Sequence, residues 1–132
     1  MSSLQEIKNA LAEFHKYLPL LPNLYPEGPW NIPSDWDKKS FPNAELPGVY
    51  FFLNAAGNLI YIGKASAGLG QRLGNGYIGQ GGKIKDPKVA EASQLYTIAL
   101  PKELFFIAPA LEEFLIFKLD PKGNTIGRPS AL

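Results

Sequence analysis

The sequence predicts a small α+β domain in which helices flank a three-stranded antiparallel sheet. Two apolar and aromatic runs, at residues 49–53 and 59–62, are separated by the turn-forming segment 54–57 and therefore predict a β-hairpin. A third run at 94–100 predicts another strand, and residues at helical spacing precede and follow this sheet region. With 132 residues, of which 45% are hydrophobic, the chain is long enough to bury one core.

Residues 3–18 are expected to form an amphipathic helix. Its apolar stripe has steps of three and four residues and comprises Leu4, Ile7, Leu11, Phe14 and Leu18. Ser3 and Glu6 have the spacing of a capping box, which satisfies free N–H groups of the first turn, and Pro19 ends the helix. The single histidine, His15, lies beside the stripe. It is either a surface or packing residue or a catalytic base, and a base would need partners that the neighbouring sequence lacks.

Residues 19–47 are too rich in proline for long regular structure. The prolines are Pro19, Pro22, Pro26, Pro29, Pro33, Pro42 and Pro47, and the interleaved aromatic residues are Tyr25, Trp30, Trp36 and Phe41. We expect an irregular but ordered segment whose rings pack on the main domain; the alternative is an aromatic platform on which bases stack. The expected organisation is therefore an N-terminal helix and proline/aromatic-rich extension over 1–47, and a main domain over 48–132.

The chain beyond the hairpin alternates helices, loops and one strand. A short helix is expected over 64–74, followed by a flexible glycine-rich loop. Residues 87–93 are expected to form another short helix before the strand at 94–100. Pro109 suits the first position of a last helix over 109–119.

The composition excludes several kinds of site. The chain has no cysteine, which rules out disulfides, thiol catalysis and Cys-ligated metals, and its one histidine cannot form a multi-histidine metal site. No apolar run reaches the roughly 18 residues of a membrane span, and the N-terminus lacks a secretory signal pattern, so we expect a cytoplasmic protein.

The net charge of +1 gives no support by itself for a nucleic-acid partner. It is unevenly distributed, however. Residues 1–47 hold four basic and six acidic residues, and residues 48–132 hold nine basic and six acidic residues. The main domain is therefore the basic part of the chain; ordinary surface scatter is the alternative explanation.

The hairpin and the helix after it carry side chains suited to phosphate chemistry. Tyr50 and Tyr61 lie on neighbouring strands, which are about 4.8 Å apart when paired, so both phenols could serve one site. Lys64 and Arg72 follow on the same segment. The nearby glycines lack the G-x-x-x-x-G-K-[ST] order of a P-loop. Taken singly, these tyrosines could be packing residues and these cations solvated surface groups.

Five elements in order resemble the GIY-YIG endonuclease domain. They are Gly48-Val49-Tyr50, Tyr61-Ile62-Gly63, Arg72, Glu112 and Asn124. The string YIGKASAGLGQRL is similar to the domain at the N-terminus of the bacterial excision-repair incision subunit. The resemblance covers residues 48–124, which is 77 of the 132 residues. The chain departs from the family pattern in having Val49 for isoleucine and one additional residue between the second tyrosine and the arginine.

Two adjacent glutamates could match the acidic residue of the family. On a helix, Glu112 shares a face with three apolar residues, whereas Glu113 faces a more mixed set. The apolar three are Leu115, Ile116 and Leu119. A carboxylate on an apolar face needs a partner, because burying a bare charge is costly. We expect that partner to be a metal ion; a salt bridge to Arg72 is the alternative.

The resemblance implies a role for each residue in phosphodiester hydrolysis. Glu112 would hold one Mg²⁺ or Mn²⁺ ion together with waters, Tyr61 would be the general base, and Arg72 would clamp the scissile phosphate. Tyr50 would position the water or the base. A free phenol titrates near pH ~10, so Lys64, Arg72 and the metal are expected to lower the pKa of Tyr61.

The resemblance therefore implies a divalent-metal-dependent endonuclease that hydrolyses a DNA phosphodiester bond. Asn124 would tie the C-terminal loop to the site. The expected substrate-binding residues are Lys64, Arg72, Tyr77, Lys83 and Lys85. DNA is the expected partner, with a protein partner or a separate DNA-targeting subunit to offset the small net charge. The alternative is a non-catalytic nucleic-acid-binding or protein-interaction domain on the same scaffold.

Overall fold

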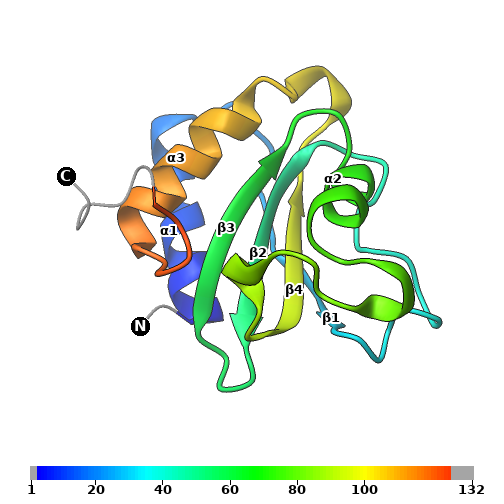
Figure 1. Ribbon diagram of the computed structural model, residues 1–132. Helices are drawn as coiled ribbons and strands as arrows, with labels where there is room; N and C mark the ends of the chain where they lie inside the picture. Colours follow the sequence, from blue (N-terminus) through cyan, green and yellow to red (C-terminus); the bar gives the residue numbers. More distant parts are fainter. Residues whose placement is uncertain (1–2, 126–132) are drawn as a thin grey trace.

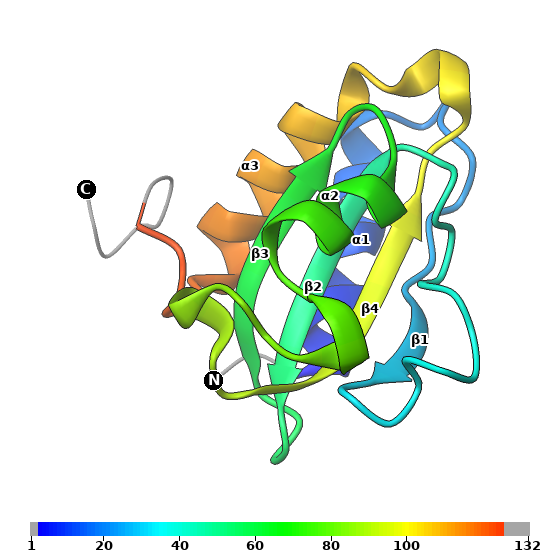
Figure 2. The same ribbon diagram turned by 45° about the vertical axis from the view of Figure 1, so that its right-hand side comes forward.

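The computed structural model describes residues 3–125, in which four antiparallel strands form one sheet in the order β1-β4-β2-β3. The strands are β1 (Glu27–Asn31), β2 (Gly48–Asn54), β3 (Leu59–Ala65) and β4 (Ala92–Ala99). Helices α1 (Leu4–Tyr17) and α3 (Ile107–Leu119) cover one face of the sheet, and α2 (Leu69–Gly76) lies on the other (Figures 1 and 2). The α+β class is confirmed, with one strand more than expected. Within residues 3–125, no helix combines the length and apolar character needed to cross a membrane.

Strand β2 supplies side chains to both faces of the sheet. Val49, Phe51 and Leu53 lie in the core beneath α1 and α3. Tyr50 and Phe52 lie in a second core beneath α2. Successive strand residues point to opposite faces, and helices cover both faces here, so the whole apolar run is buried. For the site, the consequence is that Tyr50 points to the α2 face.

Helix α1 confirms the predicted amphipathic helix and its capping box. It packs against α3, where the ring centroids of Phe14 and Phe114 are 5.3 Å apart. A ring nitrogen of His15 lies 2.9 Å from the carbonyl oxygen of Leu21, so this histidine is hydrogen-bonded to the segment that follows the helix. The packing interpretation of His15 therefore holds.

The proline-rich segment contains a strand that the sequence did not predict. β1 pairs with β4 at the edge of the sheet, and an edge strand tolerates Pro29 because half of its N–H groups face away from the ladder. Trp30 is 2% exposed in the α2-side core, with its ring centroid 4.8 Å from that of Phe41. Trp36 packs on the same core, whereas Tyr25 is exposed. These rings are mostly core rather than a stacking platform.

Two helices begin elsewhere than expected. Strand β3 continues through Ala65 because it stays paired with β2, so the next helix begins only at Leu69. Helix α3 begins at Ile107, and Pro109 lies within its first turn, where a missing N–H costs no helical hydrogen bond. Only a 3₁₀ turn, η2 (Pro87–Val89), forms in the segment expected to be a short helix before β4.

Candidate active site

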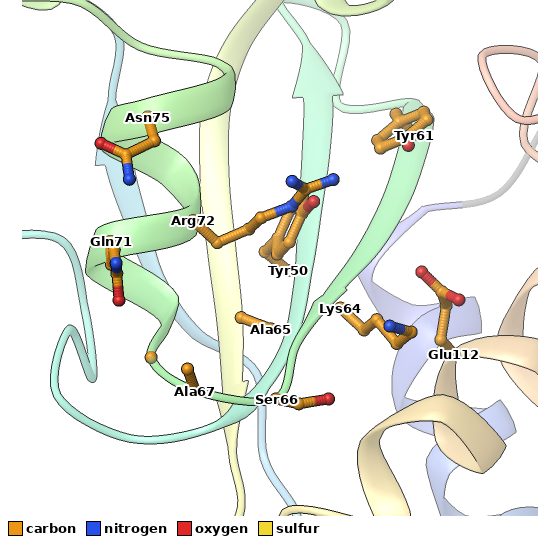
Figure 3. Close-up of a pocket in the computed structure, with 11 residues that line it drawn as sticks. Tyr50, Tyr61, Lys64, Ala65, Ser66, Ala67, Gln71, Arg72, Asn75 and Glu112 are labelled. Atoms are coloured by element: carbon orange, nitrogen blue, oxygen red, sulfur yellow. The ribbon is translucent and has the colours of Figure 1, made fainter.

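An open cleft lies at the free edge strand β3, between α2 and α3 (Figure 3). Its volume is about 600 Å³. It is lined by Tyr50, Tyr61, Lys64, Ala65, Ser66, Ala67, Gly68, Gln71, Arg72, Asn75 and Glu112. Five residues predicted from the sequence are thus brought together by β2, β3, α2 and α3.

Tyr50 reaches the cleft through space left by a glycine. Gly63 is its register partner on β3, and a Cβ atom at Gly63 would overlap the Tyr50 phenol ring. The Tyr50 side chain is 1% exposed and makes an edge-to-face contact with Tyr77, with centroids 5.3 Å apart. Burial and then Tyr77 raise the pKa of Tyr50, while Arg72 acts in the opposite direction. The glycine of the second motif therefore makes room for the tyrosine of the first.

A β-bulge turns Tyr61 toward the α2 side. The register between β2 and β3 shifts by one residue, so Ile60 is an extra residue in β3. Without the bulge, Leu59 and Tyr61 would point to the same face. Instead, Leu59 lies in the core beneath α1 and α3, and Tyr61 packs against the core beneath α2. There a hydrogen bond of 3.2 Å joins the hydroxyl groups of Tyr61 and Tyr77.

The protein alone does not acidify Tyr61. Burial is the main cause that raises the pKa of Tyr61. The neighbouring Tyr77 and Glu112 raise it further, whereas Arg72 lowers it. Arg72 acts in the expected direction, but desolvation of the phenol outweighs its charge, so the groups of the protein itself leave the pKa of Tyr61 raised rather than lowered. A base at this position therefore needs additional positive charge.

Helix α2 directs Arg72 toward Tyr50 (Figure 3). The helix has no side-chain cap; instead, the carbonyl groups of Ala44 and Leu46 accept hydrogen bonds of 2.8 and 3.0 Å from its first N–H groups. The helix begins at Leu69, and Arg72 on its first turn lines the cleft. Hydrogen bonding with Tyr50 is the main cause that raises the pKa of Arg72, so the guanidinium stays charged.

Glu112 reaches the cleft from α3 (Figure 3). It is half-buried, whereas Glu113 is exposed. Burial raises the pKa of Glu112, and the charges of Lys64 and Arg72 oppose this shift. Among residues 3–125, no ion pair within 4.0 Å includes Glu112. The alternative of a salt bridge to Arg72 is therefore not formed.

The surroundings of Glu112 fit a divalent cation. The Glu112 carboxylate is half-buried and opens into the cleft, and no protein cation in the described part of the chain lies within ion-pair distance of it. It is therefore available to bind a metal ion. The described residues contain no cluster of three or more His, Cys, Asp or Glu side chains. An ion at Glu112 would therefore keep water in most of its coordination positions, as Mg²⁺ commonly does.

Asn124 forms hydrogen bonds to the outer edge of β3, where no further strand among residues 3–125 pairs. Its side-chain oxygen accepts a hydrogen bond from the Ile62 N–H (2.9 Å), and its amide donates to the Ile62 carbonyl (2.8 Å). The N–H of Gly123 donates to the Ile60 carbonyl at 2.7 Å. These contacts fix the backbone on both sides of Tyr61. Asn124 is buried and lies outside the cleft lining, so it is placed to position Tyr61 rather than to touch a substrate.

The three remaining predicted residues lie outside the cleft lining. Tyr77 is buried beneath it, and Lys83 is exposed on the loop after α2. The ammonium group of Lys85 donates to the carbonyls of Gly74 (2.9 Å) and Asn75 (3.1 Å) at the end of α2. A cation stabilises the free carbonyls and the negative dipole end of a helix. Lys85 thus caps the helix that carries the arginine.

Three polar residues of the cleft were not predicted: Ser66, Gln71 and Asn75. Asn75 lies three residues after Arg72, a spacing that places both on one side of α2. Helical spacing from the arginine is therefore the signal that could have found it.

Comparison with known proteins gives matches only among solved structures, since no family model and no curated protein matches the sequence. The GIY-YIG N-terminal endonuclease domain of UvrC from Thermotoga maritima, bound to its catalytic divalent cation magnesium, is 39% identical. That match covers 67% of this chain and 93% of that chain, with a TM-score of 0.50. Two point mutants of the same domain, each bound to its catalytic divalent cation, are 39% identical with TM-scores of 0.51, and cover 67% of this chain and 92% and 93% of theirs. With this identity over nearly the whole related domain, the chain belongs to the GIY-YIG endonuclease domain family.

Proposed function

We propose that this chain is a divalent-metal-dependent endonuclease that hydrolyses a DNA phosphodiester bond. The observation that carries the proposal is the convergence of five side chains on one open cleft: Tyr50, Tyr61, Lys64, Arg72 and Glu112. The related UvrC domains are endonuclease domains with a catalytic divalent cation, which supports the same chemistry here.

Arg72 and Lys64 supply positive charge for the scissile phosphate. The Arg72 guanidinium points toward Tyr50 (Figure 3) and lines the cleft, so its N–H groups are available for forked hydrogen bonds to phosphate oxygens. Lys64 lies on β3 between Arg72 and Glu112 (Figure 3) and adds a point charge on that side. Together they stabilise the extra negative charge that develops in the transition state.

Glu112 is the proposed ligand of one Mg²⁺ or Mn²⁺ ion. Its half-buried carboxylate is the one acidic group in the cleft lining, so it would hold the ion on the side opposite Arg72. A bound cation would neutralise phosphate charge and lower the pKa of nearby hydroxyl groups. Because burial raises the pKa of Glu112, the cation site is lost at a higher pH than it would be for an exposed glutamate.

Tyr61 is the proposed general base. In hydrolysis, the water oxygen bonds to phosphorus, the bond from phosphorus to one ester oxygen breaks, the water loses a proton, and the departing ester oxygen takes up a proton from solvent. The phenol oxygen of Tyr61 lies in the cleft, held by its hydrogen bond to Tyr77, and would accept that proton once deprotonated. Tyr50 lies beside Arg72 and helps to orient the guanidinium.

Plasmid nicking tests this function. Supercoiled DNA should be nicked by the wild-type protein with Mg²⁺ or Mn²⁺ but not with EDTA, and Glu112→Ala should lose more than about 100-fold in rate. The matched control is Glu113→Ala, which removes the same charge one position along α3 and should nick normally. Equal nicking by the wild type and Glu112→Ala, or none by either, would leave the non-catalytic binding domain as the better description.

The N-terminal 47 residues are proposed to support a catalytic unit that comprises residues 48–132. Helix α1 packs on α3, which carries Glu112, and the carbonyls of Ala44 and Leu46 cap α2, which carries Arg72. The net charge of +1 suggests weak and salt-sensitive DNA binding. We therefore propose that a protein partner or a separate DNA-targeting subunit delivers the substrate.

A further inference from the structure

Lys88 lies beside the proposed base, on a segment that the sequence analysis did not connect with the site. After α2 the chain crosses in front of β3, on the α2 face, before it enters β4 (Figures 1 and 2). Turn η2 lies on this crossing, and it packs against β3. The ammonium nitrogen of Lys88 lies 5.6 Å from the centroid of the Tyr61 ring.

The backbone at Lys88 is fixed, but its charge remains available. The carboxylate of Asp86 accepts a 2.9 Å hydrogen bond from the Lys88 N–H, which anchors the turn. The second carboxylate oxygen of Asp86 is 3.9 Å from the Lys88 ammonium, and the Lys88 side chain is 53% exposed. An ion pair this long and exposed contributes little. An anion with more favourable geometry can therefore compete for the ammonium group.

Two cationic groups lie near the ring pair of Tyr61 and Tyr77. The two ring centroids are 5.7 Å apart, and the Arg72 guanidinium lies 5.6 Å from the Tyr77 centroid. Lys88 lies over the Tyr61 ring itself. One DNA strand carries a phosphate about every 3.4 Å of helix axis. A strand with its scissile phosphate at Arg72 and Tyr61 therefore has further phosphates within reach of a second cation along its path.

We propose that Lys88 binds a second phosphate of the same DNA strand and so directs the strand across Tyr61 toward η2. The inference rests on the proposed nuclease function and adds a substrate contact and a strand direction to it. Lys88 is thus a substrate-binding residue, and its contact with the Tyr61 ring positions the ammonium group before the DNA binds.

The test is the salt dependence of DNA binding. Affinity for a fluorescein-labelled duplex is measured in EDTA, where no cleavage occurs, at salt concentrations from about 50 to 200 mM. The slope of log K against log salt is negative, and Lys88→Met should reduce its magnitude by about 0.9 and weaken binding roughly 5- to 10-fold at 0.1 M salt. Lys88→Arg should restore the slope. The matched control, Lys8→Met on the exposed side of α1, should bind as the wild type does.

Single-turnover nicking with Mg²⁺ distinguishes a role of Lys88 in DNA binding from an effect of Lys88 on the base Tyr61. At saturating protein, Lys88→Met should cleave at the wild-type rate, with a higher half-saturating concentration. A wild-type salt slope for Lys88→Met, in a protein that nicks DNA, would overturn this inference and leave the nuclease function intact. A lower saturated rate with an unchanged slope would also overturn it, since Lys88 would then act only on Tyr61. A wild type that neither binds nor nicks DNA would overturn both proposals.

Discussion

Substitution of Gly63 by alanine is the sharpest test of how the two tyrosine motifs fit together. The added methyl group would occupy the position of the Tyr50 ring, which is 1% exposed. The ring has little room to move, because it packs against Phe52 and Tyr77 with centroids 5.9 and 5.3 Å away. We therefore expect both a loss of stability and a displaced Tyr50 phenol.

The size of the loss follows from two opposing contributions. Overpacking of a filled core costs about 1–3 kcal/mol, while replacing a strand glycine by alanine gains about 0.5–1 kcal/mol of chain entropy. The net expectation is a loss of about 1–2 kcal/mol. Gly74→Ala is the matched control, because nothing lies within 4 Å of its added Cβ in α2. That variant should gain about 0.5–1 kcal/mol.

Urea denaturation followed by circular dichroism measures both changes. With a slope of about 1–3 kcal/mol per molar urea, the midpoint of Gly63→Ala should fall by about 0.5–1 M, while that of Gly74→Ala should rise. In a Tyr50→Leu background, the added methyl group of Gly63→Ala should cost less, because the two positions are coupled. A midpoint for Gly63→Ala at or above that of the wild type would refute the explanation of this glycine.

Three further outcomes are expected. Asn124→Ala leaves the buried Ile62 N–H and carbonyl without partners, so urea unfolding should show a loss of about 2–4 kcal/mol; a loss below about 0.5 kcal/mol would contradict the positioning role. Burial raises the pKa of Glu112, so the stability that its protonated form contributes is present at acid pH and lost as pH rises through that pKa. In EDTA at neutral pH, Glu112→Gln should therefore unfold at a higher urea concentration than the wild type, and this difference should vanish at acid pH. If the variant is instead less stable than the wild type at neutral pH, Glu112 forms a favourable ion pair. Because the pKa of Tyr61 is raised, single-turnover cleavage should increase by up to about tenfold per pH unit above neutrality, and a flat profile would exclude a rate-limiting Tyr61 base.

Much of the scaffold could be predicted because its signals are local. The run at 49–53 is buried on both faces of the sheet, and Glu112 follows from helical spacing against apolar neighbours. Strand β1 could not be predicted, because Pro29 is tolerated only by virtue of its edge position, which depends on the partner strand. The bulge at Ile60 likewise depends on the register with β2, yet it decides which face Tyr61 occupies.

Electrostatic roles were the hardest part of the site to predict. Lys85 was expected to bind substrate phosphate, but its ammonium group donates to backbone carbonyls at the end of α2. The pKa of Tyr61 depends on how deeply the phenol is buried, and that burial is set by the packed core rather than by the residues adjacent to Tyr61 in the sequence. Sequence spacing therefore indicates which groups meet, while packing decides their charge states.

In the proposed mechanism, Glu112 holds a single divalent cation in the cleft, opposite Arg72. Anomalous diffraction from crystals of the protein soaked in Mn²⁺ would locate that cation. One peak within coordination distance of the Glu112 carboxylate, absent from Glu112→Gln crystals and retained in Glu113→Gln crystals, is the predicted result. A peak bound elsewhere, or no peak in the cleft at Mn²⁺ concentrations that support nicking, would contradict the claim.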